Sequence, residues 1–448
     1  IWSHFIYIFL LKELKRKIII KEINYKQPKN IFVKKYEKTT KYIIKNLLIK
    51  LVSKLTYYFK NKNNIFLINT YLSFLNEIFL QFRLNKTVKI NNSNNDSYHF
   101  KNSLNKEIRN IPIKKNLKDD QFDKIIKKII VQNIPLAFIE EYKQIKKNNI
   151  FLFWKKQPSK IFTSASNIYD DKFKIWLAEQ KENGSTFIYG QHGFQFLNKF
   201  NSIDHFLLRT CDKIISWGES YGNKKKFYPL FNVKCIAKKF KSKKGTNITI
   251  IQEMPSKHTH AIWSGLDFFD YDRYLKLQDK FLKKLKKNKY DKVIVRLGSN
   301  DRFTSTNNLL QYEKKKWSSI HPALIYQSRE TKIFEAFEKS YLTILTSVTA
   351  TTLLECISLN IPFVILTLNF KNILIKKAYK DFKLMERNKI LFTDPKKMSS
   401  FINSNSKKDI LNWWYSKKNQ NIIKHLQKNY AKVSSDPIKV FADTLLKA

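Results

Sequence analysis

The first candidate for chemistry in this chain is a histidine between glycines, in the segment Gly190-Gln191-His192-Gly193. The apolar run before it, residues 186–190, predicts a strand that ends at the histidine, and the carboxyl ends of parallel strands are where open α/β sheets bind ligands. With an unperturbed pKa of about 6.5, histidine suits proton removal from a hydroxyl. We expect His192 to be a catalytic base, with Gly190, Gln191 and Gly193 beside the substrate. The alternative is a buried histidine that bonds a neighbouring carbonyl.

The second candidate is a hydroxyl-rich turn, residues 346–352, which follows a predicted strand and opens a predicted helix. The free N–H groups and the positive dipole end of a helix N-terminus suit a phosphate. Glu355 lies within that helix. Ordinary N-capping by Ser347 or Thr349 is the alternative, but five hydroxyls within seven positions favour a phosphate. The expected nucleotide and phosphate contacts are Thr346, Ser347, Thr349, Thr351, Thr352 and Glu355.

Four other polar residues are weaker candidates. Arg296 ends a predicted strand and could pair with a donor phosphate or carboxylate as a fork, or form an ordinary surface salt bridge. Asp170 could orient a substrate, or it could cap the helix that follows it. Glu253 and His258 follow another predicted strand, where a cleft between two domains would lie.

An alternation of strands and helices, beginning near residue 149, must position these residues. Strands joined by crossover helices pair in parallel. We expect a helical N-terminal region over residues 1–148 with a polar linker near 91–97, a first α/β domain over 149–240, a second over 241–394, and C-terminal helices over 395–448 that pack across the domains. The predicted strands are residues 149–154, 160–164, 186–190, 213–217, 233–236, 248–251, 293–296, 323–326, 342–345 and 363–366, and helices are predicted after Asp170 and at 274–285.

The formal net charge of +49 bears on the choice of partner. The charge is mostly lysine spread along the chain, whereas nucleic-acid readers favour concentrated arginine forks. Solvated lysine faces that keep the protein soluble are the favoured explanation. Attraction to an anionic membrane or glycan comes next, and a nucleic-acid partner is unlikely on this evidence.

The spacing of cysteines and histidines bears on metal binding, and the length of the apolar runs bears on where the protein is located. Cys211, Cys235 and Cys356 lie far apart without metal-ligand spacing, and the histidines are scattered, so no metal site is expected. No run approaches the roughly 18 to 20 apolar residues of a membrane span, and no secretory signal is evident. We expect reduced thiols and a cytoplasmic protein, with peripheral contact at the inner face of the membrane as an option.

Several segments together resemble a family of bacterial transferases from surface-polysaccharide loci, which is similar to CDP-glycerol glycerophosphotransferases and capsule sugar transferases. These segments are residues 160–164, 169–170, 173–176, 190–193 and 216–218. Glu355 followed by Asn360-Ile361-Pro362 resembles the nucleotide-binding helix of GT-B glycosyltransferases, in which a glutamate contacts the ribose hydroxyls. The resemblance covers roughly residues 150–370.

The resemblance implies a role for both candidate segments. In the glycerophosphotransferases a Trp-His-Gly segment supplies the proposed base, and a Thr-Asp-Tyr-Ser-Ser segment holds the donor phosphates. His192 and residues 346–352 match these two places. The chain departs from the family just after the histidine, where paired glycines and a Tyr-Gly are usual and Phe194-Gln195-Phe196 stands here. An inactive homologue that acts in assembly is therefore an open alternative.

The predicted fold class is α/β and GT-B-like, with two Rossmann-like domains facing across a cleft and helical segments at both ends. The predicted function is transfer of a glycosyl or polyol-phosphate group from a nucleotide-sugar or nucleotide-polyol donor to a surface-glycan or lipid-linked acceptor. His192 takes the proton of the acceptor hydroxyl, and the 346–352 turn, with Arg296, stabilises the departing nucleotide. Neither a metal nor another cofactor is required. The rival from a different class is a basic nucleic-acid-binding protein.

Overall fold

The computed structural model describes residues 64–85, 134–147, 157–194, 196–198, 202–219, 225–236, 244–253, 271–298, 307–327, 331–368 and 370–448, with 51, 105, 107–109, 127, 130 and 240. The predicted linker at 91–97, the predicted strand at 149–154 and His258 lie outside these residues. So does most of the predicted helical region before residue 64.

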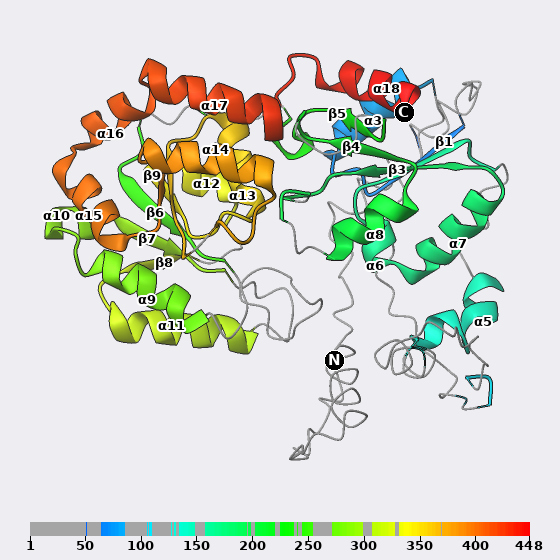
Figure 1. The fold of residues 1–448 in the computed structure, drawn as a ribbon, viewed down its shortest axis with the longest axis horizontal. Coiled ribbons are helices and arrows are strands. Elements are labelled where there is room, and N and C mark those ends of the chain that lie inside the picture. Colours follow the sequence, from blue (N-terminus) through cyan, green and yellow to red (C-terminus); the bar gives the residue numbers. More distant parts are fainter. Residues whose placement is uncertain are drawn as a thin grey trace. The chain divides into compact units, whose positions relative to one another are not determined.

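The first sheet has five strands, which lie in the order of the chain (Figure 1). They are β1 (Ile65–Ile68), β2 (Lys160–Thr163), β3 (Thr186–Gly190), β4 (Lys213–Ser216) and β5 (Phe227–Pro229). Strand β1 pairs with β2, β3 with β4, and β4 with β5, each time in parallel. Most of these residues are buried, as near-continuous apolar runs in parallel sheets usually are.

Strand β1 corrects the prediction that the N-terminal region is entirely helical. Ile65–Ile68 is completely buried and runs parallel to Lys160–Thr163. Four consecutive apolar residues fit a buried strand as well as one turn of a buried helix, so periodicity alone does not separate the two.

The predicted strand at residues 233–236 is also wrong. Val233–Cys235 forms a 3-10 turn, because the side-chain oxygen of Asn232 accepts a hydrogen bond from the Lys234 N–H (3.2 Å) and closes the turn. Strand β5 at Phe227–Pro229, a few residues earlier, was not predicted.

The second sheet has six strands in the order β11-β10-β9-β6-β7-β8, all paired in parallel. Numbered along the chain from β6, this is the order of a Rossmann sheet. The order reverses between β6 and β9, so a ligand is expected at the carboxyl ends of these two strands. The strands are β6 (Asn247–Ile251), β7 (Val293–Arg296), β8 (Ile325–Gln327), β9 (Ser340–Leu345), β10 (Phe363–Leu366) and β11 (Leu391–Phe392).

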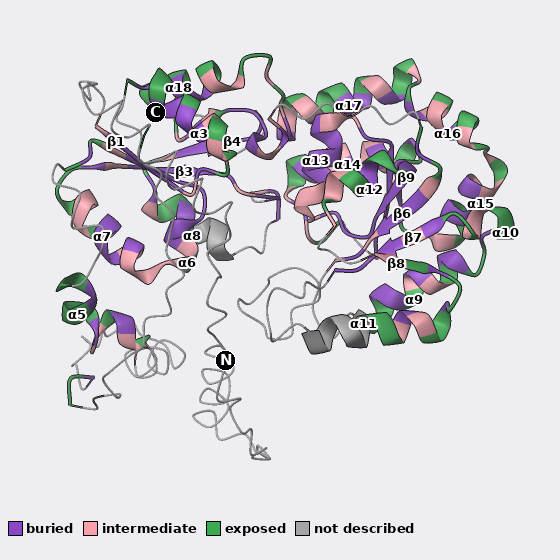
Figure 2. Ribbon diagram, turned by 180° about the vertical axis from the view of Figure 1, so that it is seen from behind, coloured by how far each residue is buried: buried purple, intermediate pink, exposed green. Residues whose placement is uncertain are grey.

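Helices connect and cover the strands, and Figure 2 shows most of the second sheet as buried, apart from its edge strand β8. Before β6 the helices are α3 (Phe74–Arg83), α5 (Tyr142–Lys147), α6 (Ser166–Tyr169), α7 (Asp171–Glu182) and α8 (Ser202–Thr210). The second sheet carries α9 (Tyr271–Leu282), α10 (Lys287–Tyr290), α11 (Asn307–Ile320), α12 (Ile333–Glu338), α13 (Thr351–Leu359) and α14 (Lys376–Arg387). The chain continues through α15 (Pro395–Ser404), α16 (Lys407–Trp414), α17 (Lys417–Tyr430) and α18 (Pro437–Lys447).

Local sequence explains how helix α13 ends beneath the candidate phosphate turn. Asn360 takes the left-handed conformation at its C-terminus (φ 52°), which asparagine tolerates better than most residues. Its side-chain oxygen accepts hydrogen bonds from Trp414 Nε1 (3.1 Å) and Gln420 Nε2 (3.2 Å). Helix α13 therefore ends at Asn360, and helices α16 and α17 hold this end in place.

The chain divides into two compact units, with the boundary inside β3. One contains residues 1–70, 84–187 and 258–262, and the other contains residues 71–83, 188–257 and 263–448. Apart from Asp170, every site residue discussed below belongs to the second unit. The α/β class with parallel sheets is confirmed, and so is a helical C-terminal segment. The cleft and the domain boundaries given above stay predictions.

A buried ion pair stabilises the first unit. Arg109 donates from Nε to Oε1 of Glu140 (2.6 Å) and from Nη2 to Oε2 (2.7 Å), and both side chains are almost completely buried. These hydrogen bonds lower the pKa of Glu140 to about 2.

Glu140→Gln should therefore change how stability depends on pH. Because the folded-state pKa lies below the ordinary value of 4.5, the pair stabilises the fold fully above that pH and loses this effect as the pH falls towards 2. The variant should lower the free energy of unfolding by about 2 kcal/mol at neutral pH and flatten its acid dependence, measured by urea unfolding. Glu107→Gln, which removes an exposed carboxylate, should do neither. An unchanged acid profile in Glu140→Gln would show that the pair does not stabilise the fold.

Candidate functional site

Gln191 shapes the loop that carries the candidate base. Its backbone N–H donates to the Ile215 carbonyl (2.9 Å), its Nε2 donates to the Gly193 carbonyl (2.7 Å), and its Oε1 accepts from the Trp217 N–H (2.7 Å). The residue is 1% exposed. The side chain expected to contact substrate thus holds the loop against strand β4, where Gly190, the last residue of β3, pairs with Ile215.

His192 is half-buried, and its Nδ1 lies 2.8 Å from the hydroxyl of Tyr189. Two arrangements of the proton fit this distance. If Tyr189 donates, Nε2 carries the ring proton; if Nδ1–H donates to the Tyr189 oxygen, Nε2 has the lone pair. Only the second arrangement leaves Nε2 able to act as a base.

An aromatic and cationic cluster adjoins the imidazole. The Tyr71 ring lies 6.0 Å from the His192 ring, centroid to centroid. The Lys234 ammonium lies 4.9 Å from the centre of the Tyr71 ring and 6.0 Å from that of Trp217. Tyr71 has a φ of 63°, a conformation that costs energy for a residue other than glycine and often occurs at functional sites.

The unusual Phe194-Gln195-Phe196 segment has a packing role at both phenylalanines. Phe194 is buried with its ring edge-on to Phe382 of α14 (6.2 Å). Phe196 packs against Tyr189 (6.5 Å) and Phe227 (5.4 Å), at a φ of 62°. A glycine would adopt this backbone without strain, which is consistent with the glycines usual in the family that the sequence resembles. The two phenylalanine side chains therefore pack against neighbouring aromatic rings, and Phe196 contacts Tyr189.

Gly193 brings the histidine loop against the first residue of helix α13. A Cβ atom at position 193 would lie 2.5 Å from Oγ1 of Thr351, closer than real Cβ contacts come. The loop can approach the helix this closely only because position 193 has no side chain. Two segments far apart in the sequence, each predicted to do chemistry, are thereby brought together.

Helix α13 begins without a side-chain cap. Ala350 occupies the N-cap position and supplies no side-chain hydrogen bond. The Ser347 hydroxyl instead accepts the Thr349 N–H (3.1 Å) and bonds the Thr349 hydroxyl (2.9 Å). These two residues shape the turn before the helix, so capping by Ser347 or Thr349 does not account for the run of hydroxyls.

Thr346 fixes the position where the strand order reverses. Its hydroxyl donates to the Ile251 carbonyl at the end of β6 (2.7 Å) and lies 2.6 Å from the Tyr274 hydroxyl. Burial raises the pKa of Tyr274 above its ordinary value, so the phenol stays protonated. Thr346, predicted to contact phosphate, ties the carboxyl ends of β9 and β6 together.

Thr351, Thr352 and Glu355 are the members of the predicted set that lie on helix α13 itself. Thr351 and Thr352 are half-buried in its first turn, and Glu355 is 9% exposed one turn further on. Residues four apart share a side of a helix, so Glu355 lies below Thr351, on the side that meets Gly193.

Arg296 and Glu253 lie at the same carboxyl edge of the second sheet. Arg296 ends β7, pairs with Ile251 of β6 and is 5% exposed. The Glu253 N–H donates to the Tyr274 hydroxyl (2.8 Å). Both residues therefore lie near the carboxyl end of β6.

Asp170 belongs to the first unit and caps a helix. Its carboxylate accepts the Phe173 N–H (3.0 Å) as the N-cap of α7, and burial raises its pKa. This is the simpler of the two roles considered from the sequence.

No group of three metal-binding side chains occurs within the described residues. The chain does contain an Asp-x-Asp sequence, Asp270-Tyr271-Asp272, which the reasoning from the sequence overlooked. Asp272 forms an ion pair with Lys316, which lowers the pKa of the carboxyl, and Asp270 lies outside the described residues. The three cysteines are buried thiols. In the part of the chain that the structure describes, no helix has the length and apolar character to span a bilayer.

Three residues of the site were missed in the sequence. Tyr189 lies three residues before His192, near the end of a predicted strand. The sequence could have indicated its role, because a tyrosine in this place can bond the histidine that follows. Tyr71 and Lys234 carried none, since only the folded chain brings them beside the loop.

The fold and the site define a parallel α/β protein with a Rossmann sheet and a polar turn where its strand order reverses. Residues 1–445 match the model of the LIC12162 family transferase. The chain belongs to this family, and the prediction of a transferase is confirmed. No curated protein matches the chain in sequence.

Solved structures that are similar to the chain include TarM, a glycosyltransferase and HepE. TarM has 13% identity and a TM-score of 0.41, over 68% of this chain and 58% of TarM, so the chain spans less than two thirds of that protein. The glycosyltransferase from Rickettsia africae has 13% identity and a TM-score of 0.41, and the match covers 87% of this chain and 98% of that protein. HepE from Anabaena, in complex with UDP-glucose, has 10% identity and a TM-score of 0.41, and the match covers 86% of this chain and 99% of HepE.

The contact between the histidine loop and α13 can be tested by a double-mutant cycle. Gly193→Ala should lower the free energy of unfolding by about 1–3 kcal/mol, and Thr351→Ala, which removes the opposing oxygen, should recover part of this loss when the two are combined. Urea unfolding should give a coupling energy of about 1 kcal/mol. Gly193→Ala combined with Thr352→Ala is the control and should be additive. Additivity in the 193/351 pair would disprove the contact.

Proposed function

We propose that the protein transfers a glycosyl or polyol-phosphate group from a nucleotide-activated donor to a hydroxyl of a surface-glycan or lipid-linked acceptor. The observation that supports this most is the approach of Gly193 to Thr351. This approach brings the loop of the candidate base against a helix N-terminus that has no side-chain cap. Nucleotides bind at this edge of a Rossmann sheet.

The donor nucleotide occupies the carboxyl ends of β6 and β9. The first N–H groups of α13 and the hydroxyls of Thr351 and Thr352 bind its phosphates, with the positive end of the helix dipole. Glu355, one turn further along, accepts hydrogen bonds from the ribose hydroxyls. Arg296, on the neighbouring strand, adds positive charge. The donor needs no metal or further cofactor in this mechanism.

The acceptor hydroxyl lies against Nε2 of His192. Nδ1–H donates to the Tyr189 oxygen, which puts the lone pair on Nε2, and Nε2 takes the proton as the acceptor oxygen attacks the donor carbon or phosphorus. The bond from that atom to the nucleotide phosphate breaks, and the electron pair leaves with the nucleotide. The groups at the start of α13 stabilise the negative charge that develops. The proton on His192 then passes to water. We place this reaction in the cytoplasm, at the inner face of the membrane.

Nucleotide binding is the first test. CMP, CDP, UDP and GDP should be compared by thermal unfolding, and at least one diphosphate should raise the Tm. A ligand at a hundred times its Kd stabilises a fold by about 2.7 kcal/mol. Thr351→Val with Thr352→Val should remove most of the shift, and Thr210→Val, on α8, is the control. No shift with any of the four would contradict the proposed donor site.

The base is tested separately, by nucleotide release from the donor type that the first test selects. His192→Ala should lower kcat by at least about a hundredfold and keep the nucleotide-induced rise in Tm. Tyr189→Phe should lower kcat by about tenfold with little change in KM, because the hydroxyl sets the proton position on His192. His425→Ala, which removes a half-exposed imidazole paired with Asp381 of α14, should keep wild-type turnover. Full activity in His192→Ala would exclude it as the base.

A further inference from the structure

Helix α3 exposes a stripe of large apolar side chains in addition to the apolar residues that it buries. Leu75, Phe79 and Phe82 are 61%, 55% and 38% exposed, whereas Ile78 and Leu80 are buried together with Glu77 and Gln81. Surface helices normally keep polar residues on the side that faces water. The exposed positions recur at spacings of four and three, so they form one stripe, which indicates that this face meets something other than water.

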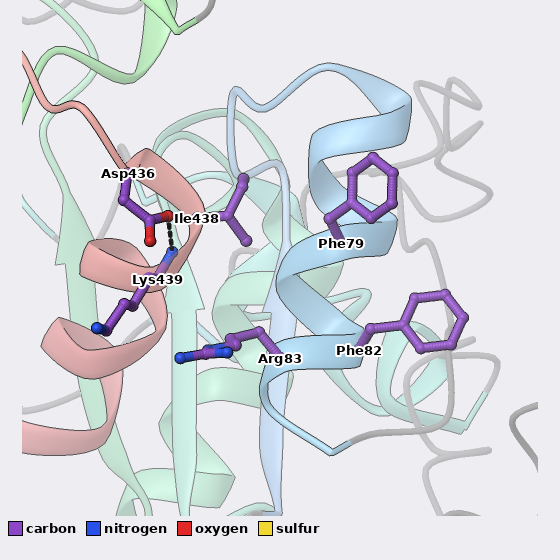
Figure 3. Close-up of a pocket in the computed structure, with 6 residues that line it drawn as sticks. All are labelled: Phe79, Phe82, Arg83, Asp436, Ile438 and Lys439. Carbon is purple, nitrogen blue, oxygen red and sulfur yellow. Dashed lines mark hydrogen bonds between the residues drawn. The ribbon is translucent and has the colours of Figure 1, made fainter.

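Positive charge accompanies this stripe. Helix α18 packs beside α3, and a pocket of about 410 Å³ lies at their junction, lined by Phe79, Phe82, Arg83, Asp436, Ile438 and Lys439 (Figure 3). In Figure 3 Arg83 reaches towards α18, while Phe79 and Phe82 point away from it.

The two helices expose slightly more cations than carboxylates. Arg83, Lys439 and Lys447 are exposed cations, and the exposed carboxylates are Asp436 and Asp443. Asp436 accepts the Lys439 N–H (3.3 Å) as the N-cap of α18. The surface therefore offers aromatic side chains beside guanidinium and ammonium groups, in a chain whose net charge is +49.

We propose that α3 and α18 form a docking surface for an anionic lipid bilayer. Phenylalanine and leucine side chains enter the boundary between head groups and acyl chains, and cations beside them pair with lipid phosphates. Arginine and lysine can do both, because their stems are apolar and their ends are charged. The protein lies on the membrane through this surface. A protein partner would match the apolar stripe equally well, but the adjoining excess of cations favours the phosphate-covered surface.

The docking surface begins close to the candidate base. Tyr71, which contacts the His192 ring, precedes α3 in the chain. The helix is about 15 Å long at 1.5 Å per residue, so an acceptor held at the bilayer surface is within reach of this region. The docking surface itself does not depend on the proposed chemistry.

The test is co-sedimentation of the full chain with vesicles of phosphatidylcholine, with and without phosphatidylglycerol. Binding should require phosphatidylglycerol and weaken as salt is raised. Phe79→Ser with Phe82→Ser should weaken it by at least about tenfold. Arg83→Gln with Lys439→Gln should weaken it by about fivefold for each charge.

Two matched controls distinguish binding through this surface from non-specific binding to the vesicles. Phe206→Ser, on α8, removes a phenylalanine that is 55% exposed, as Phe79 is, and should leave binding unchanged. Lys397→Gln with Lys408→Gln removes two exposed lysines from α15 and α16 and should change it far less than the 83/439 pair does. Thermal unfolding shows whether each variant is folded.

Three results would overturn the proposal. The first is absence of binding to phosphatidylglycerol vesicles by the wild-type chain. The second is an equal loss in the surface variants and their controls. The third is self-association of the wild-type chain that Phe79→Ser with Phe82→Ser abolishes while lipid binding persists, which would assign the stripe to a second copy of the chain.

Discussion

The constraint on which the site depends is the absence of a side chain at position 193. The loop that carries His192 can meet the first turn of α13 only because Gly193 presents a hydrogen to Thr351. Other contacts keep the same segments together: Leu197 accepts a hydrogen bond from the Ile375 N–H (2.9 Å), and Asn232 donates to the Ser358 hydroxyl of α13 (3.0 Å). The position of the histidine loop relative to the helix is thus set by the close backbone approach and a few buried polar bonds.

Polar residues around this contact divide into those that hold it and those to which the proposed function gives a role. The side chains of Gln191 and Thr346 bond the ends of strands, and Ser347 and Thr349 bond one another. With these hydroxyls bonded elsewhere, helix α13 begins without a side-chain cap. In the proposed function the first N–H groups of the helix serve the donor phosphates, and preorganised donors stabilise developing charge better than mobile ones.

The sequence was informative where a single segment determines its own structure. Short apolar runs bounded by polar residues predicted β2, β3, β6 and β7, and the capping preference of aspartate indicated the start of α7 at Asp170. It was ambiguous for β1, where four apolar residues fit two structures. The sequence could not show which hydroxyls bond the ends of strands, because Thr346 and Thr351 differ only in their neighbours in space. The approach of Gly193 to Thr351 depends on the tertiary fold and leaves no local signal.

The position of Tyr71 links two features that are otherwise separate. This residue lies just before the N-terminus of α3, in a left-handed conformation, and its ring is close to the imidazole of His192. With α3 on a membrane, a lipid-anchored acceptor would reach His192 by diffusion in a plane instead of through bulk water. Its effective concentration, more than its intrinsic affinity, would then set the rate of encounter. A water-borne sugar would lack this advantage, so the enzyme would discriminate between the two without any contact dedicated to the lipid.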